Sequence, residues 1–131
     1  MSLPAFDHPF DVFELQAVVH ALDKDRTLGV YILDVREDYE VAAVPPLPHA
    51  IVMPMRDFEK ALNMWGSEFQ RRYNARKPGK KDRIVVYAYN GIRAAAAAMM
   101  LNNRGYKQAV YLNATLAAYL EQTQNELNED L

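Results

Sequence analysis

Residues 83–93 read Arg-Ile-Val-Val-Tyr-Ala-Tyr-Asn-Gly-Ile-Arg, and the stretch from Ala94 to Leu101 follows them directly. Residues 84–87 form a continuous, β-branched apolar run, which predicts a strand buried on both faces. Five consecutive alanines, two methionines and a leucine then predict a helix that ends at Arg104-Gly105. A strand, a short glycine-containing loop and a helix N-terminus form an anion cradle, because the first N–H groups of the helix have no partners within it.

The rest of the chain alternates predicted strands and helices around this unit. Further strands are expected at residues 30–36, 50–53 and 106–112, and helices at residues 11–22 and from 113 or 115 to about 124. Asp11, followed by Glu14, has the pattern of a capping box at the first helix. This order predicts one α/β domain in three layers, with helices on both faces of a mostly parallel sheet of about five strands. The domain takes residues 1–131, with a core over about residues 10–122 and an acidic tail to Leu131.

Residues 55–82 separate two of the predicted strands. Apolar residues recur there at helical spacing and predict one or two helices with a buried stripe of Phe58, Leu62, Trp65 and Phe69. Residues 70–82 carry a group of basic side chains: Arg71, Arg72, Arg76, Lys77, Lys80 and Lys81. Two interpretations stay open for this basic segment, a solvated loop that turns at Pro78-Gly79, or an anion-attracting patch beside the cradle.

The composition excludes several classes of protein. The chain has 131 residues, a net charge of −2 and a pI near 5.9, which argues against a dedicated nucleic-acid binder. No stretch is apolar enough to span a bilayer, and the N-terminus lacks the pattern of a secretory signal, so we expect a cytoplasmic protein without a membrane partner. The chain has no cysteine, and no histidine has a second one at metal-ligand spacing, so neither a metal nor another cofactor is expected.

Candidate site residues gather at the carboxyl ends of two predicted strands. Asp34 and Arg36 end the strand at residues 30–36, and the loop at residues 88–93 follows the strand at residues 84–87. Ligands of open α/β sheets bind at this edge. We therefore expect Asp34 and Arg93 to lie on one edge of the sheet and either to pair directly or to share a hydrogen-bond network.

The loop also carries a resemblance to a known family. Residues 86–94, Val-Tyr-Ala-Tyr-Asn-Gly-Ile-Arg-Ala, resemble the active-site segment of a rhodanese domain, whose pattern is V-Y-C-x-x-G-x-R-[SA]. In that family the cysteine carries a sulfane sulfur as a persulfide, and here Ala88 stands at its position. Residues 32–37, Ile-Leu-Asp-Val-Arg-Glu, resemble the family pattern L-I-D-V-R-E.

Elsewhere the resemblance is weaker, although it covers roughly residues 10–122. The family pattern G-H-I-P-G-A-I-N-I-P aligns with residues 45–54, where its histidine falls on Pro46 and its second glycine on His49. The pattern L-x-G-G-[IL]-x-x-W aligns with residues 112–119, where both glycines and the tryptophan are replaced. The resemblance implies a rhodanese fold.

The resemblance implies a sulfurtransferase-like domain without sulfurtransferase activity, acting as a binding or regulatory module. A methyl group at position 88 cannot attack or store sulfur, and the loop contains no serine or threonine to replace the thiolate. We expect no catalytic residue, a partner that is either a protein or a small anion held by the N–H groups of residues 89–93, and support for the pocket from Asp34, Arg36 and His49. The predicted ligand loop comprises Ala88, Tyr89, Asn90, Gly91, Ile92 and Arg93.

Two alternatives stay open. One is an engineered Cys-to-Ala form of an active thiosulfate sulfurtransferase. The other is an enzyme of another kind that uses Asp34, His49 and Arg93 in the same pocket, with His49 as the base. A phosphoacceptor receiver domain built on Asp34 is disfavoured, because the acidic pair and the late-strand lysine of that family are absent.

Overall fold

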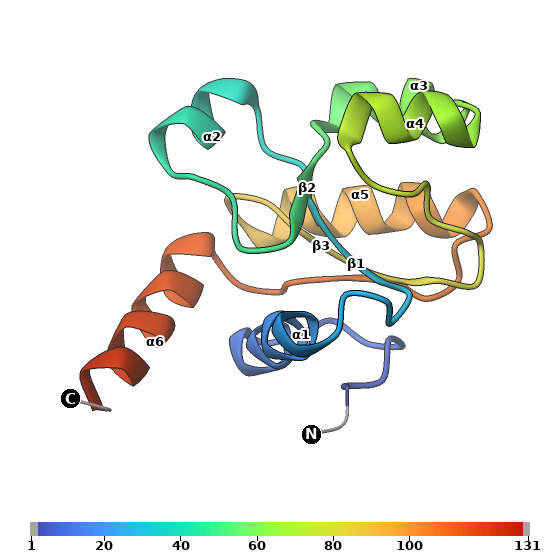
Figure 1. The fold of residues 1–131 in the computed structure, drawn as a ribbon. Coiled ribbons are helices and arrows are strands. Elements are labelled where there is room, and N and C mark those ends of the chain that lie inside the picture. Colours follow the sequence, from blue (N-terminus) through green and yellow to red (C-terminus); the bar gives the residue numbers. More distant parts are fainter. Residues whose placement is uncertain (1–2, 130–131) are drawn as a thin grey trace.

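The computed structural model describes residues 3–129, with side chains through Gln124. Helices and strands alternate along most of the chain (Figure 1). In chain order the elements are α1 (Val12–Lys24), β1 (Val30–Asp34), α2 (Asp38–Ala43), β2 (Ala50–Val52), the 3-10 helix η1 (Met55–Asp57), α3 (Phe58–Leu62), α4 (Gly66–Tyr73), β3 (Arg83–Tyr87), α5 (Gly91–Asn103), β4 (Ala109–Tyr111) and α6 (Leu116–Glu129).

The sheet is parallel throughout and has the strand order β2-β1-β3-β4. It has four strands in the described residues, where about five were expected. A single bridge between Phe10 and Leu112 continues the sheet beyond β4, with Phe10 N–H donating to the Tyr111 carbonyl at 2.8 Å. The bridge does not lengthen into a strand, because Asp11 immediately begins α1.

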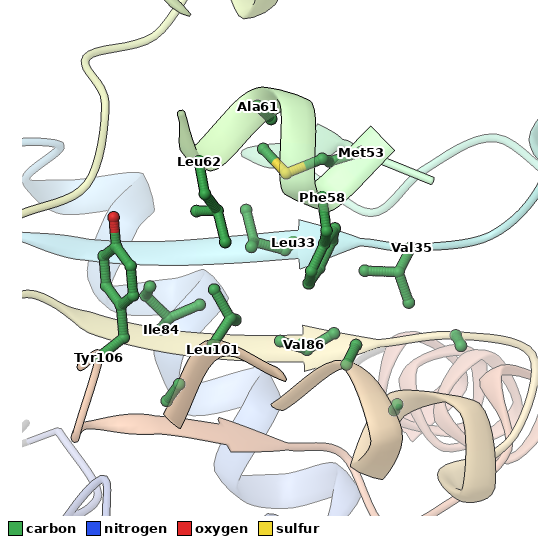
Figure 2. Close-up of a cluster of buried hydrophobic side chains, with 14 of the residues drawn as sticks. Leu33, Val35, Met53, Phe58, Ala61, Leu62, Ile84, Val86, Leu101 and Tyr106 are labelled. Carbon is green, nitrogen blue, oxygen red and sulfur yellow. The ribbon is translucent and has the colours of Figure 1, made fainter. Parts of the chain in front are cut away.

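The alternation of side chains along each strand produces two cores. Leu33 of β1 and Val86 of β3 face the core under α3, α4 and α5 (Figure 2), whereas Ile32 and Val85 face the core under α1 and α6. Figure 1 shows α1 and α6 on one side of the sheet and α3, α4 and α5 on the other. The three-layer α/β/α architecture is therefore confirmed.

Local signals set most helix ends. The capping box at α1 is confirmed, because Asp11 Oδ1 accepts from Glu14 N–H at 2.8 Å while the Glu14 side chain accepts from Asp11 N–H. Helix α5 ends two residues before Gly105. The φ of Gly105 is 95°, a backbone conformation in which a residue with a Cβ atom would be strained. Helix α6 runs on to Glu129, past the expected end near residue 124, because residues 120–129 contain neither glycine nor proline to stop it.

The segment between β2 and β3 folds as η1, α3 and α4. Phe58, Leu62 and Phe69 are buried, as the stripe predicted, but Trp65 is 82% exposed. Trp65 lies in the break between α3 and α4, at the N-cap of α4, so its side chain leaves the stripe and faces solvent.

No helix within residues 3–129 combines the length and the apolar character needed to cross a bilayer.

Candidate functional site at the carboxyl edge of the sheet

Asp34, at the end of β1, is fully buried and bound to Arg36. Its carboxylate accepts from Arg36 N–H at 3.0 Å, from Nε at 3.0 and 3.1 Å and from Nη2 at 2.7 Å. Arg36 is itself 2% exposed. Burial is the largest single influence and lowers the pKa of Arg36, but the hydrogen bonding to Asp34 and the negative charges nearby together outweigh it, so the net change in the pKa is upward. The two residues form a neutral, buried ion pair with two-pronged geometry.

Tyr87 extends this ion pair across the sheet. Its hydroxyl donates to Asp34 Oδ2 at 2.7 Å and accepts from the Leu47 N–H at 2.9 Å. Burial is the main cause that raises the pKa of Tyr87, so the hydroxyl stays protonated and keeps donating. The group Asp34, Arg36, Tyr87 and Leu47, called here the buried lock, ties the ends of β1 and β3 to the segment before β2.

The segment 88–93, called here the 88–93 loop, follows β3 at the same edge of the sheet, as its place after a parallel strand predicts. Residues 88–90 make the connection, which is shorter than the expected six residues, because residues 91–93 already form the first turn of α5. Ala88 is 1% exposed and packs in the core shown in Figure 2. Asn90 is the N-cap of α5, and its Oδ1 accepts from the N–H groups of Ile92 at 3.0 Å and Arg93 at 3.2 Å. Two of the five N–H groups expected to hold an anion therefore already bind a side-chain oxygen.

Glycine at position 91 was expected to supply backbone angles that residues with a side chain resist, but its role is different. Its backbone is not left-handed; it is the first residue of α5, where a Cβ would lie 3.1 Å from Asn113 Oδ1 and 3.5 Å from the Leu112 carbonyl. Glycine at this position lets α5 approach the chain after β4. Tyr89 and Ile92 are 60% and 82% exposed, so their side chains point to solvent and do not cover the backbone N–H groups of the 88–93 loop.

Arg93 binds Glu40 of α2, and not Asp34. Its Nη1 and Nη2 donate to Glu40 Oε2 at 3.0 Å and Oε1 at 2.8 Å. Asp34 is occupied by Arg36, whose Nη1 reaches the Glu40 carbonyl at 3.4 Å. The expected direct pairing of Asp34 with Arg93 is thus absent, but both residues belong to one chain of contacts that passes through α2.

Glu40 is expected to make stability depend on pH. The hydrogen bond with Arg93 is the main cause that lowers the pKa of Glu40 below its ordinary value near 4.5. A depressed carboxylate pKa stabilises the fold above the unfolded-state pKa, and this contribution is lost as pH falls through the folded-state value. The difference in unfolding free energy between the wild type and Glu40→Gln should therefore be constant near neutral pH and shrink below about pH 4.5.

Urea unfolding at several pH values measures this difference. Asp38→Asn is a suitable control, because the Asp38 side chain is 78% exposed and its ion pair with Arg56 is a surface contact. A gap between wild type and Glu40→Gln that stays the same from pH 7 to pH 3 would show that the Arg93 pair does not determine the charge of Glu40.

An apolar groove of about 380 Å³ lies beside the loop. Exposed hydrophobic side chains gather around it, including Tyr39 at 75%, Tyr89 at 60%, Val44 at 38% and Leu120 at 39%. It is lined by Arg36, Tyr39, Glu40, Ala43, Val44, Tyr89, Leu116, Ala117 and Leu120. The carboxyl edge therefore combines a neutral charge network with an open apolar surface.

His49 does not join this edge. It directly precedes β2, so it lies at the amino edge of the parallel sheet, and its Nε2 contacts Asp23 Oδ1 at 2.6 Å. The expected pocket of Asp34, Arg93 and His49 is therefore not formed. The basic segment also leads to the amino edge, because residues 74–82 connect α4 to the start of β3, and Lys77 donates to the carbonyls of Leu62 and Met64.

Sequence reasoning missed Glu40, Tyr87 and the capping role of Asn90. Glu37 and Glu40 are three residues apart at the start of α2 and form a capping box, which is a recognisable sequence signal. Asn90, at the start of a predicted helix, is also a residue type preferred at N-caps. Nothing in the sequence marks Tyr87 as a partner of Asp34. Among the described residues, no group of three or more histidine, aspartate or glutamate side chains could hold a metal ion.

Comparison with known proteins assigns this arrangement to a family. A family model described as "Rhodanese-like domain" matches residues 14–122. The "Rhodanese domain-containing protein CG4456" of Drosophila melanogaster is 33% identical over 81 residues, which cover 62% of this chain and 73% of that protein. A tRNA uridine(34) hydroxylase of Nitrobacter winogradskyi is 29% identical over 118 residues, which cover 78% of this chain but only 43% of the hydroxylase.

A solved structure supports the same assignment. The human single-domain sulfurtransferase TSTD1 superposes with a TM-score of 0.75 at 27% identity, over 86% of this chain and 95% of the human one. The fold, the loop after β3 and the family match thus agree over most of the sequence, and we conclude that the chain belongs to the rhodanese-like domain family.

Proposed function

We propose that this chain is a rhodanese-like domain without sulfurtransferase activity, which acts as a binding or regulatory module. The observation that carries the proposal is Ala88, which stands where the family resemblance places the sulfur-carrying cysteine and is buried in the core. Sulfur transfer from thiosulfate needs a thiolate that takes the outer sulfur while sulfite leaves, and this chain contains no cysteine.

The surroundings of Ala88 support the proposal further. Asn90 Oδ1 takes the N–H groups of Ile92 and Arg93, which would otherwise be available to a sulfur anion. The Arg93 guanidinium is held at both terminal nitrogens by Glu40. Two internal acceptors therefore occupy donors that an external anion would need, and the adjoining apolar groove is suited to a protein partner.

The alternative of an enzyme of another kind lacks the base that it requires in the pocket. His49, which was to act on a substrate together with Asp34, lies at the other edge of the sheet. Asp34 is enclosed by Arg36 and Tyr87 and has no exposed surface. The assay described next distinguishes our proposal from the alternative of an engineered Cys-to-Ala form of an active enzyme.

The test measures thiocyanate formation from thiosulfate and cyanide by three proteins. The wild type is expected to give no turnover above a heat-inactivated sample. Ala88→Cys restores the thiol, but we expect little turnover, because Asn90 and Glu40 still occupy the donors of the loop. Ala88→Cys combined with Asn90→Gly frees the N–H groups of Ile92 and Arg93 and should turn over faster than Ala88→Cys alone.

Mass spectrometry of the two cysteine variants after incubation with thiosulfate reports directly whether a sulfur atom is added at position 88. Turnover by the wild type contradicts the proposal. Full activity of Ala88→Cys alone would show that the cysteine is the one missing part, and would favour the Cys-to-Ala alternative.

A further inference from the structure

A second cavity lies at the amino edge of the sheet, away from the 88–93 loop. It has a volume of about 480 Å³, within the range of small-molecule sites. Its walls come from four separate segments of the chain: the end of α1 with the following turn, the start of β1, the residues around the start of β2, and the turn after α4. We call it the amino-edge cavity.

Unusual backbone conformations concentrate around the amino-edge cavity. Within residues 3–129, the non-glycine residues with positive φ are His49 at 67° and Asn74 at 55°, and both line the cavity. Gly29, with φ of 68°, lines it too. Asparagine tolerates this conformation, but a histidine in it costs about 1–2 kcal/mol. The fold thus holds the His49 ring at this wall in spite of a backbone strain that glycine would remove.

The charged groups that line the cavity are cationic. Arg26 and Arg76 are both lining residues, and no carboxylate is among them. Arg26 forms no ion pair with any described residue, and the ion pair of Arg76 with Asp82 is long, at 3.8 Å. The neighbouring Tyr31 side chain is the main cause that raises the pKa of Arg76.

The nearby carboxylates do not line the cavity, and each has a close hydrogen-bond partner other than the two arginines. Asp25 accepts from the N–H of Thr27 at 2.9 Å and from its hydroxyl at 2.6 Å, which closes the turn after α1. Asp82 accepts from the Gly79 N–H at 2.7 Å, and Asp23 contacts His49. The two guanidinium groups are therefore the charges best placed to meet a ligand.

The rest of the wall is partly polar, with Thr27, His49 and Asn74 among the lining residues, and partly apolar. Leu22, Val30 and Ile51 line the cavity, and the first two belong to the core under α1. A ligand that fits this surface needs a flat apolar part to cover these side chains and a negative group to meet the arginines. Apolar walls with a few convergent polar groups are typical of small-molecule sites.

We propose that the amino-edge cavity binds a small organic anion, in which one phosphate or carboxylate group meets Arg26 and Arg76 and an aromatic or other flat apolar body packs against Val30 and Ile51. Arginine binds such groups through paired N–H donors. This site is independent of the 88–93 loop and of whether sulfur transfer occurs there.

The test is a titration of the full chain, labelled with ¹⁵N, with three probes. Phenyl phosphate carries the ring and the anion, benzyl alcohol the ring alone, and inorganic phosphate the anion alone. At constant ionic strength, phenyl phosphate should shift the amides of residues 26–31, 49–51 and 74–76. Each of the other two probes should bind on the order of tenfold more weakly.

Paired charge variants locate the site. Arg26→Ala combined with Arg76→Ala should weaken phenyl phosphate binding on the order of tenfold or more. Lys60→Ala combined with Arg71→Ala removes the same charge from the exposed surfaces of α3 and α4, and should leave the affinity unchanged. The amide spectra of both variants also report whether they are folded.

Three results would each overturn the proposal. The first is equal affinity for phenyl phosphate and benzyl alcohol, and the second is an equal loss of phenyl phosphate affinity in the two double variants. The third is that the amide shifts centre on residues 88–93. Absence of any saturable shift with phenyl phosphate would overturn it too.

Discussion

Replacing Asp34 by alanine is expected to lower the free energy of unfolding by about 3–5 kcal/mol. The substitution leaves the Arg36 guanidinium buried without its carboxylate, because Arg36 is 2% exposed and keeps a hydrogen bond to the Glu40 carbonyl at 3.4 Å and a contact with the Tyr87 ring. It also takes the acceptor from the Tyr87 hydroxyl, which is buried with the same carboxylate. A charge and a polar group without partners in the interior both favour the unfolded chain.

Urea unfolding followed by circular dichroism measures the loss. Asp38→Ala is the matched control, since it removes the same side chain from a surface pair in which Asp38 is 78% exposed, and it should cost no more than about 1 kcal/mol. If both variants lost the same stability, the buried lock would not stabilise the fold in the way that its geometry implies.

Phe58→Ala is the second large effect that we expect, again about 3–5 kcal/mol. Phe58 begins α3, has no exposed surface, and points at the sheet between Leu33 and Val35 in Figure 2. Truncation removes its apolar surface from the core and leaves a cavity that the two parallel strands cannot close, because their backbones are fixed by hydrogen bonds to their neighbours.

Phe13→Ala provides the comparison for this variant. Phe13 lies in α1 and is 56% exposed, so the same deletion there should change stability by less than about 1 kcal/mol. Thermal and urea unfolding of both variants give the two values. A small loss for Phe58→Ala would mean that α3 can move down onto the sheet and refill the space.

The fold could be predicted from the sequence because it rests on periodicity. The apolar runs at residues 30–34 and 83–87 alternate between the two cores, and Asp11 and Gly105 mark helix ends by local chemistry. The position of Asp34 and Arg93 at one edge of the sheet can be predicted from strand direction alone, because both lie at or after the carboxyl ends of parallel strands. These features depend on neighbours in the sequence or on the repeat of a strand.

The partners of the charged residues could not be predicted in this way. Asp34 had two arginines within reach, and it pairs with Arg36 because the turn after β1 folds that side chain back onto it. Arg93 pairs with Glu40 because α2 lies beside the 88–93 loop. No local sequence pattern predicts where α2 packs. The position of His49, by contrast, was available from the sequence, because a residue that precedes a parallel strand lies at the amino edge.

The strand order has a consequence for how the chain folds. Among the strands of the described residues, β2 pairs with β1 and β4 pairs with β3, and the central pair of β1 with β3 joins these two halves of the sheet. That pair joins residues 53 positions apart in the chain, as for Asp34 and Tyr87. Joining the two halves therefore closes a longer loop, at a greater cost in chain entropy, than either edge pairing does. We therefore expect the pairing of β1 with β3 to limit the folding rate.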